Sequence, residues 1–170
     1  MKFVSILVAL GLLAGVATAV QPTAVDVTFV DAEKFTDAGD AYGWPARSSE
    51  HNLEQLRDYI VARVTPLLAE GQRLTIEITD LDLAGEFEPW HGPGYRDVRM
   101  VKSLYPPRIN LSFRLYDATD RVVAEGSRRL RDLGFMFAAT PTAGNDSLRY
   151  EKNLLDSWVR REFRPRRSVG

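Results

Sequence analysis

The sequence contains no cysteine, so no disulfide bond can stabilise the fold that it adopts. Histidine is nearly as scarce: the chain has only His51 and His91, which are far apart and outside any HExxH pattern. A zinc centre is therefore not expected. The chain also lacks a G-x-S-x-G elbow, which together with the missing cysteine argues against nucleophilic catalysis.

An excess of positive charge is missing as well. The chain has 22 basic and 23 acidic side chains, which gives a formal net charge of −1 at pH 7. Binding to nucleic acid is therefore not expected. Gly92-Pro93-Gly94 is too short for a phosphate-binding loop, and its proline lacks an N–H donor. We therefore expect no bound cofactor.

The first residues have the pattern of a cleavable secretory signal peptide over residues 1–19. A basic Lys2 precedes an apolar run over residues 3–16, and Ala17-Thr18-Ala19 supplies the small residues of a cleavage site. The run is shorter than the roughly 20 apolar residues that a membrane anchor needs. The pattern predicts a periplasmic or secreted protein with no transmembrane segment after cleavage.

After cleavage, we expect residues 20–163 to form a single globular domain, which is large enough to bury a core without disulfides. Residues 164–170 are predicted to be a disordered tail, because they carry charge and proline and offer little to bury. Basic side chains near this end could contact anionic lipid headgroups: Arg160, Arg161, Arg164, Arg166 and Arg167. The alternative is a solvated tail, with the first two arginines favouring the helix dipole.

Alternation of apolar and polar residues predicts strands over residues 25–30, 74–79 and 109–115. A tight connection at residues 117–120 indicates a hairpin from the third of these into a further strand that ends near Leu130. A weaker strand is predicted within residues 95–103. These segments favour a sheet of four or five strands, mainly antiparallel.

Two segments have helical periodicity. The first begins near Ser48, carries a leucine-rich stripe, and must kink or stop at Pro66, which has no N–H to donate. The second begins near residues 145–147 and ends near Phe163, with Trp158 in its apolar stripe. The order β-α-β-β-β-β-α predicts an α+β fold with both helices packed on one face of the sheet.

Four separated strings resemble a family of bacterial exported domains of unknown function, the family numbered 3016. The strings occur in the family's order and cover nearly the whole chain after the signal peptide. The resemblance implies a secreted or periplasmic protein of Gram-negative bacteria, and it implies no activity, cofactor or catalytic residue. The four strings are residues 35–37 (Phe-Thr-Asp), 79–85 (Thr-Asp-Leu-Asp-Leu-Ala-Gly), 105–109 (Tyr-Pro-Pro-Arg-Ile) and 150–158, which contains Tyr-Glu-Lys and Leu-Leu-Asp-Ser-Trp.

The densest polar cluster lies in an acidic turn predicted over residues 80–91 and contains Asp80, Asp82, Glu86, Glu88 and His91. The candidate ligands for a metal are Asp80, Asp82, Glu86 and His91. An EF-hand match fails there, because Ala84 replaces a third oxygen ligand and His91 replaces the final glutamate. The favoured interpretation is that the two aspartates bond local backbone N–H groups. The alternative is a metal- or carboxylate-dependent hydrolase centred on this turn.

The loops are richer in aromatic residues than solvation alone would favour. Tyr42, Trp44, Trp90 and Tyr105 all lie outside the periodic segments, and they are the candidate binding residues. The alternative is that Trp44 and Trp90 fold back and cap the core. We expect a non-catalytic periplasmic binding or envelope-maintenance protein, with an envelope protein or a glycan as its partner.

Overall fold

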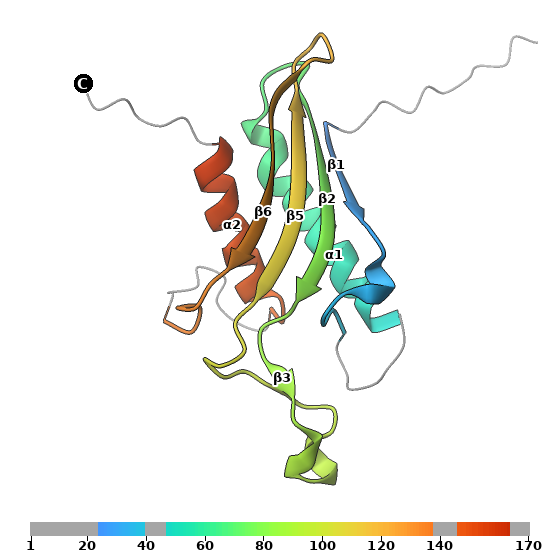
Figure 1. The fold of residues 1–170 in the computed structure, drawn as a ribbon, viewed down its shortest axis with the longest axis vertical. Helices are drawn as coiled ribbons and strands as arrows, with labels where there is room; N and C mark the ends of the chain where they lie inside the picture. The colour runs from blue at the N-terminus through green and yellow to red at the C-terminus, as the bar shows by residue number, and fades with distance from the viewer. Residues whose placement is uncertain (1–23, 40–46, 138–145, 164–170) are drawn as a thin grey trace, which may run out of the picture.

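The computed structural model describes residues 24–39, 47–137 and 146–163 (Figure 1). It shows an α+β fold in which a four-stranded sheet carries two helices on one face. The signal peptide predicted at residues 1–19 and the tail predicted at residues 164–170 lie outside the described residues. Within the described segments, no helix is both long and apolar enough to cross a membrane.

The main sheet contains β1 (Val25–Phe29), β2 (Arg73–Asp82), β5 (Arg108–Tyr116) and β6 (Val122–Arg131), in the order β1-β2-β5-β6. Strand β1 runs parallel to β2, and the other two pairings are antiparallel. The parallel pair requires a long crossover, which the first helix supplies. The prediction of a mainly antiparallel sheet is therefore confirmed.

Helices α1 (Arg47–Val64) and α2 (Arg149–Phe163) cover the same face of this sheet (Figure 1). Helix α1 ends just before Pro66, and a 3-10 turn over Thr65–Leu67 follows. This is the stop predicted from the missing N–H of that proline. The apolar stripes of both helices meet the inward side chains of the strands, and Trp158 is 0% exposed at the centre of this core.

Two sequence-based expectations are corrected at the end of the sheet. Asp80 and Asp82 do not form a turn: they belong to β2, which continues past a bulge between Ile78 and Asp80. The weaker strand expected within residues 95–103 is reduced to β4 (Arg99–Met100). Antiparallel pairing with this short strand forms β3 (Glu86–Phe87), which the sequence did not predict.

Residues 86–105 form an arm that projects from the end of the sheet (Figure 1). The arm begins at β3, passes through two 3-10 turns at Pro89–His91 and Pro93–Tyr95, and returns through β4. Two-residue strands bury little apolar surface, so the arm needs other contacts to hold its shape. Those contacts define the candidate functional site.

Candidate binding site at the end of the sheet

The segment after β1 is tied to the last residues of β2. The backbone N–H of Thr36 donates to Asp80 Oδ1 at 2.9 Å, and the Thr36 hydroxyl donates to Asp80 Oδ2 at 3.1 Å. One residue later, the N–H of Asp37 donates to the carbonyl of Leu81 at 2.9 Å, and Asp37 forms an isolated parallel bridge with Asp82. The chain therefore holds the Asp37 carboxylate beside the end of the sheet.

An ion pair joins this carboxylate to the arm. The two terminal nitrogens of Arg99, in β4, donate to the two oxygens of Asp37 at 2.7 and 3.0 Å. Arg99 also donates to the carbonyls of Gly39 and Gly85, at 2.6 and 3.2 Å, and its guanidinium lies over the ring of Phe87. Bidentate arginine contacts fix orientation as well as charge, so Arg99 clamps the arm to the sheet.

A second ion pair lies on the neighbouring strands. The Nε of Arg108, in β5, donates to Asp82 Oδ2 at 2.7 Å, and the two residues are paired across β2 and β5. Burial raises the pKa of the Asp82 carboxyl, and the contact with Arg108 acts in the opposite direction. On its other side Arg108 is paired with Arg131 of β6. The end of the sheet therefore carries a carboxylate and two guanidinium groups in a row.

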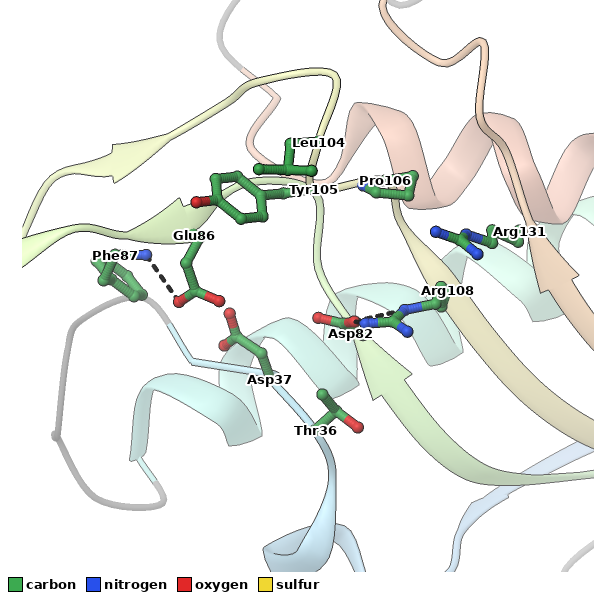
Figure 2. Close-up of a pocket in the computed structure, with 10 residues that line it drawn as sticks. All are labelled: Thr36, Asp37, Asp82, Glu86, Phe87, Leu104, Tyr105, Pro106, Arg108 and Arg131. Atoms are coloured by element: carbon green, nitrogen blue, oxygen red, sulfur yellow. Dashed lines mark hydrogen bonds and ion pairs between the residues drawn. The ribbon is translucent and has the colours of Figure 1, made fainter.

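These residues line a cavity of about 270 Å³ between the end of the sheet and the base of the arm (Figure 2). Charged side chains of both signs face it, and Tyr105 and Pro106 form one of its walls. The volume is close to the lower end of the range for small-molecule pockets. The lining residues are Thr36, Asp37, Asp82, Glu86, Phe87, Leu104, Tyr105, Pro106, Arg108 and Arg131.

Next to the cavity, the buried carboxylate of Glu88 holds the base of the arm together. Glu88 is 2% exposed and accepts hydrogen bonds from Lys102 Nζ, at 2.8 and 2.6 Å, and from the Tyr105 hydroxyl at 2.9 Å. The Nε2 of His91 lies 2.8 Å from Glu88 Oε2, whereas the Tyr105 hydroxyl is bound to Oε1. These contacts, with Lys102 first, lower the pKa of Glu88, and the bond to Glu88 raises the pKa of Tyr105.

The tip of the arm carries three aromatic rings. The His91 ring centroid lies 6.1 Å from that of Trp90 and 6.3 Å from that of Tyr95. Trp90 is 69% exposed and Tyr95 is 48% exposed. Because His91 is also bound to Glu88, the tip is connected to the buried base of the arm.

The aromatic candidates are found in different environments. Trp90 is exposed at the tip and does not cap the core, contrary to the alternative interpretation of this residue. Tyr105 is half-buried and lines the cavity, with its hydroxyl bound to Glu88. Tyr42 and Trp44 lie outside the described residues. Two of the four candidates therefore belong to the arm, on different parts of it.

The four metal candidates do not form one cluster, although Asp82 and Glu86 line the same cavity. Asp80 is bound by the segment after β1, Asp82 by an arginine of β5, and Glu86 by the N–H of its own neighbour. His91 lies on the arm and contacts Glu88. In the described ranges, no group of three His, Asp or Glu side chains is placed to hold a metal ion.

Sequence reasoning included Glu88 in the polar cluster, but it missed four other charged residues at this end: Asp37, Arg99, Arg108 and Arg131. Their partners are distant in the sequence, so no local spacing indicates the contacts. The resemblance supplies part of a signal, because Asp37 lies in the first of its four strings and Arg108 in the third. The alternation of β6 does place Arg131 on the side of the sheet away from the buried Leu130.

A family model described as "Protein of unknown function (DUF3016)" matches residues 23–161. The chain belongs to the DUF3016 family. The resemblance seen in the sequence is thereby confirmed. No curated protein matches the chain, and neither does any solved structure.

In this DUF3016 chain, three of the four strings contribute residues to the cavity. The fourth string contacts the second: the buried Oε1 of Glu151 accepts a hydrogen bond at 2.7 Å from the N–H of Ala84, two residues after Asp82. The other oxygen of Glu151 has no hydrogen-bond partner among the described residues. Burial raises the pKa of the Glu151 carboxyl. All four strings therefore meet at the same end of the sheet.

Proposed function

We propose that the protein is a non-catalytic binding protein of the bacterial envelope, and that it contacts a glycan through the tip of the arm. One observation carries this proposal: Trp90 is 69% exposed at the end of a projection whose base is buried. Trp90 lies beside the exposed ring of Tyr95 and the ring of His91, and the face of an exposed indole can stack on a sugar ring.

The arm supports the proposal because it holds the tip in place before any ligand arrives. Glu88 is buried and contacts His91, Lys102 and Tyr105, so the turn that carries Trp90 is anchored at its base. A rigid aromatic side chain loses little conformational entropy on binding. The tip therefore offers a preorganised contact surface.

The size of the tip favours a sugar over a protein partner. A fully covered aromatic side chain buries roughly 150–250 Å², whereas a specific protein interface needs about 800 Å² from each side. Trp90, His91 and Tyr95 are only partly exposed, so together they offer less than this. Neighbouring polar groups on Arg96 and Asp97 are exposed and can bond sugar hydroxyls.

The alternative of a hydrolase has weaker support. Its proposed centre is Asp80, Asp82, Glu86 and His91, of which only Asp82 and Glu86 line the same cavity. Asp80 and His91 are bound by other partners and do not line it. The envelope location rests on the signal peptide predicted at residues 1–19 and on the export that the family resemblance implies.

The test is co-sedimentation and calorimetry with purified envelope glycan, using Trp90→Ala. We expect binding to weaken at least about tenfold, with the melting temperature unchanged because the side chain packs little. The matched control is Phe137→Ala, which removes another exposed aromatic ring, 89% exposed, outside the arm. Equal glycan binding by the wild type and Trp90→Ala would contradict the proposal, as would binding to a protein partner but not to glycan.

A further inference from the structure

The charges around the cavity do not all cancel. Asp37 is matched by Arg99, and Asp82 is matched by Arg108. The remaining two charged lining residues are Glu86 and Arg131. Glu86 accepts a hydrogen bond only from the N–H of Phe87, at 2.9 Å, and neither it nor Arg131 has an ion-pair partner among the described residues.

These two unmatched groups lie at opposite ends of the cavity. Glu86 comes from β3 in the arm, and Arg131 comes from the end of β6; Figure 2 shows them on opposite sides of Tyr105 and Pro106. The cavity therefore has a negative end and a positive end. Leu104, Tyr105 and Pro106 line one wall, and the Asp82–Arg108 ion pair lies between the two ends.

The position of Arg131 is unfavourable in the absence of a ligand. It stands directly across from Arg108 in the β5–β6 pairing, and like charges facing each other across a sheet destabilise it. Asp82 neutralises only one of the two guanidinium groups. An anionic group bound between the strands would relieve this repulsion and would suit the bidentate geometry of arginine.

We propose that the cavity binds a small zwitterion of amino-acid or dipeptide size, with its carboxylate at Arg131 and its ammonium group at Glu86. The apolar part of the ligand would lie against Leu104, Tyr105 and Pro106. A cavity of about 270 Å³ can accommodate a ligand of this size. This site is separate from the tip of the arm and does not depend on the glycan proposal.

Calorimetry with matched probes tests both ends of the ligand. The zwitterions are L-leucine and glycyl-L-leucine, N-acetyl-L-leucine lacks the ammonium group, and L-leucinamide lacks the carboxylate. We expect at least one zwitterion to bind, and each masked leucine to bind about tenfold more weakly than its parent. The proposal is wrong if the masked forms bind as tightly, or if no zwitterion binds at up to about 10 mM.

Variants assign each charge to its residue. Arg131→Gln should abolish the preference for leucine over leucinamide. Glu86→Gln should abolish the preference for leucine over N-acetyl-leucine. Each variant and its masked ligand form a cycle that measures the coupling between one residue and one ligand charge. The controls are Arg129→Gln, which removes an exposed arginine two residues earlier on β6, and Glu33→Gln, which removes an exposed glutamate elsewhere. Both preferences should survive in the controls.

Two controls show whether a change in leucine binding reflects the cavity and not unfolding or the tip of the arm. In thermal melts without ligand, Glu86→Gln should match the wild type, because Glu86 has no ion pair among the described residues to lose. Arg131→Gln should be at least as stable as the wild type, because it removes the repulsion between Arg131 and Arg108. Trp90→Ala should bind leucine as the wild type does. Preferences that persist in both cavity variants would place the ligand elsewhere and overturn the proposal.

Discussion

The body of the molecule and its arm are held together by different forces. The body buries apolar side chains from four strands and two helices, with Trp158 fully enclosed. The arm buries few apolar side chains, and its shape depends on the carboxylates of Glu88 and Asp37 and on their cationic partners. Apolar burial is largely insensitive to pH and salt, whereas ion pairs are sensitive to both.

This difference implies that stability and binding can be separated. A change in the core should alter the folding of the whole molecule, whereas a change at the base of the arm should alter the presentation of Trp90 and of the cavity. Local regions with few apolar contacts also open more easily than the core.

Truncation of the core should have the largest effect on stability. Trp158 packs edge-on against Phe113 and Phe163, with ring centroids 5.8 and 5.5 Å away. We expect Trp158→Ala to cost about 3–5 kcal/mol of unfolding free energy, as aromatic truncations in cores do. Denaturant melts measure this loss. Trp90→Ala is the matched control and should stay within about 0.5 kcal/mol of wild type; similar losses in both variants would refute the division.

Release of the clamp should have an intermediate effect. Arg99 and Asp37 have side chains only 18% and 19% exposed, so their ion pair is largely shielded from water. We expect Arg99→Ala to cost about 2 kcal/mol, in the range of hydrogen bonds to charged groups. Arg99→Lys keeps the charge and loses the bidentate geometry. Its unfolding free energy should therefore lie between those of the wild type and Arg99→Ala. In Arg99→Ala, amide hydrogen exchange should be faster in residues 86–105 than in β2 and β5.

The sequence predicted the body well and the arm poorly. Strands β2 and β5 alternate regularly, so Ile76 and Phe113 were placed on the buried face by spacing alone. Strands β3 and β4 are two residues long and carry no periodicity that could reveal them. The contact between Asp37 and Arg99 joins residues distant in the chain, which local patterns cannot indicate.

Acidification should loosen the arm with the smallest effect on overall stability. The folded-state pKa of Glu88 is below its usual value of 4.5, so its contacts stabilise the fold fully above that pH. The contribution is lost as the pH falls through the lowered folded-state pKa. We expect proteolysis within residues 86–105 to accelerate at low pH, and Glu88→Gln to show this susceptibility already at pH 7. A pH response of the arm that is unchanged in Glu88→Gln would contradict this assignment.

The basic residues of β6 also bear on how the protein behaves at high concentration. Within the described residues, β6 pairs only with β5, which leaves its outer edge open to another strand. Exposed edges of this kind invite copies of a protein to join their sheets and aggregate. Arg129 and Arg131 are exposed along this strand. Two copies of β6 brought together would crowd these positive charges, so Arg131, which lines the cavity, and its neighbour Arg129 also oppose edge-to-edge assembly.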